Sequence, residues 1–203
     1  MNKKWFAPVL PYLAVWVGLF VFKNVWLALV GFHLAIGLAL ILLRATLPFD
    51  TLIKNQQRGY ILASMLICIL SGLGLLLLWN VLGVANDLHE QLIPLGLNER
   101  TWAGFIAYFT LVNPWVEEYF WRGVLGSDTS WIYIGDLIFA GYHTMILWEK
   151  VPFSSILIAL VALVFAGWFW RQLYWRDGGL LAPVLGHMAA DLSILLVVYT
   201  LAG

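Results

Sequence analysis

Long apolar runs recur along almost the whole chain, and they restrict what it can fold into more than any other feature. Runs of roughly the length of a membrane-spanning helix follow one another from Trp5 to Leu201, with short polar segments between them. A spanning helix needs about 20 apolar residues. Backbone inside a bilayer must satisfy its own hydrogen bonds, and a helix does so within each run. We therefore expect an all-α fold, a polytopic transmembrane helical bundle.

The limits of the runs predict about seven spans, with six to eight as the range. The range reflects Asn113-Pro114, where one run can divide into two short helices. No separate soluble domain is expected, so the chain 1–203 forms one transmembrane domain, with N-terminal spans in 1–100 and polar clusters in 101–203. The expected spans are 5–22, 25–43, 60–85, a run from 102 that is interrupted at 113–114, 131–148, 153–170 and 180–201.

Charged residues are few and balanced, which excludes several classes of function. They make up 11% of the chain, with 11 basic and 11 acidic residues, and the mean hydropathy is +0.89. Soluble domains carry about 25% charged residues. A chain without net charge offers no basic field to a nucleic acid. The single cysteine, Cys68, excludes a disulfide framework and a thiolate zinc site.

The Lys and Arg residues between the runs predict the orientation in the membrane. With a cytoplasmic N-terminus, eight of them fall inside and three outside, and cytoplasmic loops normally carry the excess. We expect an integral membrane protein with its N-terminus in the cytoplasm, and the short loops favour a prokaryotic inner or plasma membrane. The inside set is Lys3, Lys4, Arg44, Lys54, Arg58, Arg122, Arg171 and Arg176, and the outside set is Lys23, Arg100 and Lys150.

Three polar clusters in the second half interrupt the apolar pattern, each in a different run. Every cluster contains a pair of residues spaced four apart, and on a helix such a pair lies on one face. The three faces can therefore point at one shared, water-containing cavity. The pairs are Glu118 with Arg122, Phe139 with His143, and His187 with Asp191, and Glu117 directly precedes the first pair.

Hydrolysis of a peptide bond needs residues of these types. A carboxylate in a low-dielectric pocket can act as a general base toward water. Two imidazoles can stabilise a developing oxyanion, or they can bind a metal together with a carboxylate. Both interpretations stay open for Glu117, His143 and His187. Neighbouring helical residues point about 100° apart, so Glu118 is expected to pair with Arg122 while Glu117 faces the cavity.

Other polar residues in the apolar runs are less informative. Asp136 lies seven residues before His143, on roughly the same helix face, and it either supports the site or serves packing alone. His33 and Asn80 are isolated in the sequence, and we expect both to be packing residues.

The ordered set of clusters resembles a family of membrane enzymes. Glu-Glu-x-x-x-Arg, Phe-x-x-x-His and His-x-x-x-Asp/Asn on successive membrane helices resemble the CPBP family of intramembrane proteases, which includes CAAX prenyl endopeptidases of type II, bacteriocin-processing enzymes and Abi proteins. The resemblance covers roughly 113–196. It implies that Glu117 activates the water, and that His143 and His187 stabilise the oxyanion or hold a metal such as Zn²⁺.

Asp191 stands where this family often has Asn. An Asn side chain can donate a hydrogen bond to an oxyanion, whereas an ionised Asp cannot. The catalytic role implied for Asp191 is therefore to orient His187, to ligate a metal or to work in its protonated form. Glu118, Arg122 and Phe139 are expected to support the catalytic residues.

The clusters and the resemblance favour an intramembrane endopeptidase acting on a membrane-associated protein or peptide. The implied substrates are a C-terminal sorting anchor, a bacteriocin leader or a CAAX-like tail, and both a glutamic protease and a metalloprotease fit the residues. A proton- or ion-coupled transporter with Glu, His and Asp as a relay is the alternative from another class. A third hypothesis is an inactive relative that serves as an immunity or scaffold protein.

Overall fold

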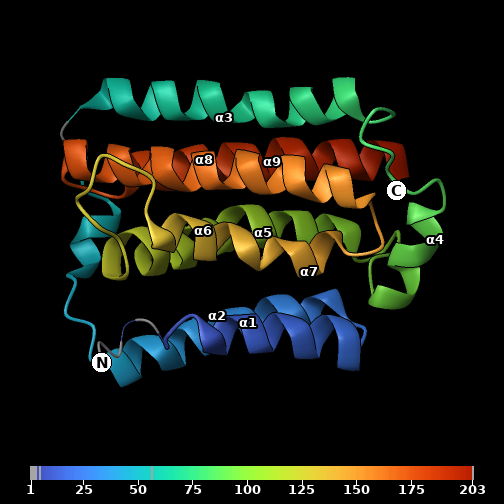
Figure 1. Ribbon diagram of the computed structural model, residues 1–203, viewed down its shortest axis with the longest axis horizontal. Coiled ribbons are helices and arrows are strands. Elements are labelled where there is room, and N and C mark those ends of the chain that lie inside the picture. The colour runs from blue at the N-terminus through green and yellow to red at the C-terminus, as the bar shows by residue number, and fades with distance from the viewer. Residues whose placement is uncertain (1–3, 5, 56, 203) are drawn as a thin grey trace.

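Helices packed side by side make up most of the computed structural model, which describes residues 4, 6–55 and 57–202 (Figure 1). No strand occurs in these residues. The helices are α1 (Val9–Trp16), α2 (Val25–Leu43), α3 (Arg58–Leu78), α4 (Leu88–Leu92), α5 (Trp102–Glu117), α6 (Ile134–Gly141), α7 (His143–Leu147), α8 (Phe153–Asp177) and α9 (Leu181–Ala202). In Figure 1, α3 forms one outer layer and α1 with α2 the other, while α8 and α9 lie next to α3, and α5, α6 and α7 lie next to α1 and α2.

The observed helices follow the apolar runs and confirm the predicted all-α membrane bundle. Among the described residues, four helices are long and apolar enough to cross a membrane, namely α2, α3, α8 and α9. The segments Val9–Val21 and Ile134–Leu147 are shorter apolar helices. α5 continues without a break into a π-helical stretch, η5 (Glu118–Val124). The number of seven crossings stays a prediction.

Apolar side chains cover the outside of the bundle as well as its interior. On α3, Leu62, Leu66 and Leu77 are each more than 60% exposed. A soluble protein rarely exposes an apolar surface of this extent. The outer face of α3 is therefore suited to lipid, and the polar residues that matter for function must be sought inside.

Small residues bring α9 close to α3. A Cβ atom added at Gly72 would lie 2.5 Å from Cβ of Ser193, and one at Gly186 would collide with Oγ of Ser64. The backbone N–H of Gly72 also donates a hydrogen bond to Oγ of Ser193, at 3.1 Å. Small residues at such contacts let membrane helices approach closely. This contact fixes α9, and with it His187, against the rest of the bundle.

Two basic residues that were assigned to the cytoplasmic side prove to be internal. Arg122 is 2% exposed and Arg171 is 1% exposed, and each pairs with a buried carboxylate. Inside the bundle they no longer count as loop charges, so the orientation argument rests on the other basic residues. Of these, Lys3 lies outside the described residues, as does Trp5, where the first expected span begins.

Candidate active site

The acidic pair lies where the helix changes its geometry. α5 contains Pro114, which has no N–H to donate to the carbonyl of Thr110, and at Glu118 the chain passes into η5. π-helical turns are rare and occur frequently at functional sites. Glu117 and Glu118 are 1% and 0% exposed, so both carboxylates lie inside the bundle.

Glu118 joins the first polar cluster to the third. Its Oε1 lies 3.1 Å from Nη1 of Arg122, the pairing expected from their spacing, and it accepts a hydrogen bond of 2.7 Å from Nδ1 of His187 on α9. The other ring nitrogen of His187 lies 3.5 Å from Oδ1 of Asp191. His187 thus lies between two carboxylates, and a single buried chain of contacts runs from Arg122 to Asp191.

Aromatic rings hold this ionic chain on both sides. The guanidinium of Arg122 lies 3.8 Å from the ring centre of Phe139 and 5.0 Å from that of Trp170. The imidazole of His187 stacks on Trp170 with ring centres 4.3 Å apart. A cation over an aromatic face is attracted by the negative charge of that face. Phe139 therefore supports Arg122 directly, and the second polar cluster meets the other two.

Glu117 has a different partner, Tyr142, which lies between α6 and α7. The Tyr142 hydroxyl donates a hydrogen bond of 2.5 Å to Oε1 of Glu117. The ring of Tyr142 stacks on His143, with centres 4.0 Å apart. Nδ1 of His143 lies 3.3 Å from the carbonyl oxygen of Phe139, and because a carbonyl only accepts, Nδ1 carries the proton. Nε2 of a neutral His143 is then an acceptor.

One oxygen of each acid in the site is buried without a hydrogen-bond partner in the described part of the chain. These oxygens are Oε2 of Glu117, Oε2 of Glu118 and Oδ2 of Asp191. Buried carboxylate oxygens are normally hydrogen-bonded. The three oxygens can therefore accept hydrogen bonds from a molecule that enters the site.

The zinc interpretation finds no ready set of ligands. Within the residues that the structure describes, no group of three or more His, Cys, Asp or Glu side chains is arranged to hold a metal ion. Each candidate ligand has another contact: Glu117 with Tyr142, His143 with a backbone carbonyl and His187 with Glu118. The described residues therefore do not present a preformed site for a metal ion.

Asp136 does not reach His143 but forms a separate ion pair. Its two carboxylate oxygens accept hydrogen bonds from Nε and Nη2 of Arg171, at 3.0 Å and 2.8 Å. Arg171 also donates to the backbone carbonyls of Ser127, Thr129 and Trp131, at 2.9, 2.5 and 2.7 Å. This arrangement clamps the loop between η5 and α6 onto α8.

His33, which was expected to be a packing residue, makes specific hydrogen bonds between helices. Its Nε2 lies 3.0 Å from Oδ1 of Asn113, and its Nδ1 lies 3.1 Å from the Tyr108 hydroxyl. Asn113 precedes Glu117 by four residues, so this pair ties α2 to the helix that carries the acidic pair. The spacing of four residues from Asn113 to Glu117 could have indicated from the sequence that Asn113 lies near the site. No such spacing indicates Tyr142.

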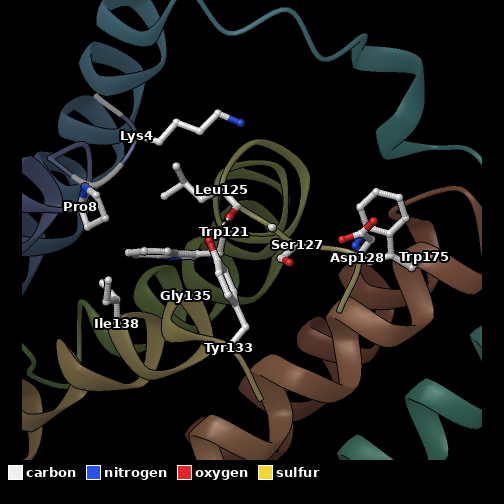
Figure 2. Close-up of a pocket in the computed structure, with 11 residues that line it drawn as sticks. Lys4, Pro8, Trp121, Leu125, Ser127, Asp128, Tyr133, Gly135, Ile138 and Trp175 are labelled. Carbon is white, nitrogen blue, oxygen red and sulfur yellow. Dashed lines mark hydrogen bonds between the residues drawn. The ribbon is translucent and has the colours of Figure 1, made fainter. Parts of the chain in front are cut away.

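A cavity of about 350 Å³ lies at the end of the bundle that carries Lys4 (Figure 2). Lys4 and Asp128 contribute the charged groups of its lining. Trp121 forms part of its wall and stacks nearly parallel to Tyr142, with ring centres 6.4 Å and planes 10° apart. The predicted catalytic residues do not line this cavity, but Trp121 does (Figure 2). Trp121 stacks on Tyr142, whose hydroxyl donates to Glu117, so two side chains connect the cavity wall to Glu117.

Comparison with known proteins shows which family this segment of the chain resembles. Residues 99–193 match the family model of the type II CAAX prenyl endopeptidases, Rce1-like. No curated protein and no solved structure matches the chain. The matched segment contains all three polar clusters, from Glu117 to Asp191, and the family is one of proteases. Residues 99–193 are therefore similar to the Rce1-like type II CAAX prenyl endopeptidases, a family of proteases, and the apolar helices are those of an integral membrane protein.

Proposed function

We propose that this protein is an intramembrane endopeptidase in which Glu117 activates water for attack on a peptide bond. The observation that carries the proposal is the convergence of the three clusters. Glu118 contacts both Arg122 and His187. Glu117 and His143 both contact Tyr142, Glu117 through the hydroxyl and His143 through the ring. A transporter relay would spread such groups across the membrane, so convergence together with the protease family favours hydrolysis.

The proposed reaction starts at Oε2 of Glu117, the oxygen that Tyr142 leaves free. This oxygen takes a proton from water while the water oxygen bonds to the carbonyl carbon of the substrate. The carbonyl oxygen becomes an oxyanion. When the tetrahedral intermediate collapses, the C–N bond breaks and the proton on Glu117 passes to the leaving nitrogen. The products are a carboxyl terminus and an amine.

His187 stabilises the oxyanion in this proposal, and His143 joins it only when a proton on Nε2 makes that nitrogen a donor. A protonated His187 lies between Glu118 and Asp191, and with Arg122 the four charges cancel. A hydrogen bond from an imidazolium strengthens as negative charge develops on the substrate, which lowers the barrier. Asp191 is assigned the orienting role because its carboxylate lies beside Nε2 of His187.

The proposed substrate is a protein or peptide held at the membrane, such as one with a C-terminal anchor, a leader segment or a CAAX-like tail. The cavity beside Trp121 supports entry from the end of the bundle that carries Lys4 (Figure 2). With the N-terminus in the cytoplasm of a prokaryote, this end faces the cytoplasm, and cleavage takes place near that side.

Mass spectrometry of membranes with and without this chain tests the activity and finds a substrate, seen as one shortened terminus. In proteoliposomes, Glu117→Gln should then lower kcat by about 10²- to 10⁴-fold, the range for loss of a general base. Glu90→Gln is the matched control, because Glu90 is an exposed acid on α4. A Glu117→Gln variant as fast as the wild type would contradict the proposal. Loss of activity in chelator with recovery in Zn²⁺ would instead assign the reaction to a metal.

A further inference from the structure

Tyr142 contacts both Glu117 and His143, although it belongs to none of the pairs spaced four apart. Its hydroxyl and the carboxylate of Glu117 are both buried, and the hydrogen bond joins them across two helical segments. We propose that Tyr142 is a positioning residue, which holds Glu117 so that one defined oxygen acts as the base. This inference rests on the proposed role of Glu117.

The two oxygens of the Glu117 carboxylate are not equivalent. Oε1 accepts the hydrogen bond from Tyr142, whereas Oε2 is buried and has no partner in the described part of the chain. A carboxylate without a fixed donor can rotate and present either oxygen to water. While Oε1 accepts the hydrogen bond from Tyr142, Oε2 is held toward the reacting water. The carboxylate is therefore oriented before the substrate binds, and the entropy lost in orienting it does not add to the barrier.

The ring of Tyr142 is itself immobilised, which a positioning role requires. Aromatic side chains from four segments surround it, so the ring cannot turn away from Glu117 without disturbing them. They are Trp121 of η5 (6.4 Å between ring centres, planes 10° apart), Phe32 of α2 (5.0 Å), Phe139 of α6 (6.2 Å, planes 79° apart) and Tyr12 of α1 (6.2 Å, planes 79° apart). Residues locked by packing in this way hold a functional group within a narrow range of positions.

The break between α6 and α7 is also held in place. The Tyr12 hydroxyl donates a hydrogen bond of 2.5 Å to the carbonyl of Ile138, and it occupies the space that a Cβ at Gly141 would need. Thr144 donates through Oγ1 to the carbonyl of Gly141, at 2.8 Å. Both ends of the turn are therefore tied, and Tyr142 points from it toward Glu117.

Steady-state kinetics of Tyr142→Phe in proteoliposomes, with the substrate found as above, test the proposal. The variant keeps the ring and its aromatic contacts and loses only the hydroxyl. Because a hydrogen bond to a charged group contributes about 1.5–3 kcal/mol, kcat should fall about 10- to 100-fold while KM stays within twofold. Tyr199→Phe is the control, since Tyr199 lies half exposed on α9 and contacts Trp102 instead of the site.

Replacement of Tyr142 by 3-fluorotyrosine gives a second measurement, because this residue keeps the hydroxyl and should restore kcat to within threefold of the wild type. A Tyr142→Phe variant with unchanged kcat would overturn the proposal. So would a raised KM with normal kcat, which assigns Tyr142 to substrate binding. If Glu117→Gln is inactive and Tyr142→Phe is fully active, the positioning role alone fails. If Glu117→Gln is fully active, the proposed function itself fails.

Discussion

Residues 4–98 and residues 99–193 bury different kinds of side chain, although both are helical and apolar outside. Within the described residues, every buried charged side chain lies between Glu117 and His187. Before residue 99, Ser64 is the buried polar side chain in the described part, and the others are apolar. Charge inside a membrane protein is costly and is retained for function or for a specific contact. The family match begins at residue 99, so it coincides with the half that buries charge.

The apolar half nevertheless forms one wall of the site. Phe32 and Tyr12 pack on the ring of Tyr142, and His33 bonds to Asn113 on α5. The buried charged side chains and some of the side chains that support the site therefore come from different halves of the chain. The second half contains the proposed reacting groups, whereas the first half packs against Tyr142 beside them and hydrogen-bonds to the helix that carries Glu117.

Buried charge alone does not identify the reacting groups in the second half. The pair of Asp136 and Arg171 is as buried as the cluster around Glu118, but its hydrogen bonds go to a loop backbone. In the Glu118 cluster, carboxylate oxygens are left without partners in the described part of the chain. The difference separates a structural ion pair from a site that can accept a substrate.

The largest effect on stability is expected from Arg171→Met, which breaks the structural pair. Asp136 would keep its charge without its partner, and the carbonyls of Ser127 and Trp131 would lose their donor. The carbonyl of Thr129 would keep the donor from Gln172. Removing one member of a buried ion pair costs about 3–5 kcal/mol. The free energy of unfolding in mixed micelles measures this loss.

Arg100→Met is the control for that experiment, because Arg100 is exposed. Its free energy of unfolding should change by less than about 0.5 kcal/mol. Equal stabilities for the two variants would show that the buried charges of the second half do not hold the loop in place.

A smaller effect is expected from His33→Leu, which tests the support given by the first half. The substitution leaves Asn113 and Tyr108 without their shared partner, and an unpaired buried polar group costs about 1–3 kcal/mol. Because Asn113 lies one turn before Glu117, kcat should fall severalfold as well. Leu34→Ala, at a position 70% exposed on α2, is the control for both measurements. Unchanged kcat in His33→Leu would limit this half to a role in stability.

The smallest effect is expected from Tyr12→Phe. The variant loses one hydrogen bond to the carbonyl of Ile138 and keeps the ring against Tyr142. Side-chain hydrogen bonds in membrane proteins contribute about 0.6 kcal/mol on average, so kcat and the free energy of unfolding should change little. A fall in kcat larger than that of Tyr142→Phe would reverse the proposed order, with α1 as the main determinant of the position of Glu117.

Much of the fold and part of the site were predictable because they depend on local spacing. Runs of about 20 apolar residues define membrane helices without knowledge of their neighbours. A spacing of four residues likewise predicts the contact of Glu118 with Arg122 and the proximity of His187 and Asp191, seen at 3.1 and 3.5 Å.

Contacts between helices were not predictable in the same way. The hydrogen bond from His187 to Glu118 depends on how α9 packs against η5, and that from Tyr142 to Glu117 depends on the turn between α6 and α7. A single sequence contains no direct signal for either. For the same reason Arg122 and Arg171 were counted as loop charges, since burial depends on packing as well as on position along the chain.

The π-helical stretch Glu118–Val124 has a consequence for the length of related chains. Its hydrogen bonds span five residues, as the bond of 2.9 Å from the Leu125 N–H to the Phe120 carbonyl shows, whereas those of an α-helix span four. Each residue of an α-helix turns the chain by about 100°. Deleting one residue after Arg122 would therefore allow an α-helix to form and rotate the following loop. Relatives with an α-helix here should carry a one-residue gap between the acidic pair and that loop.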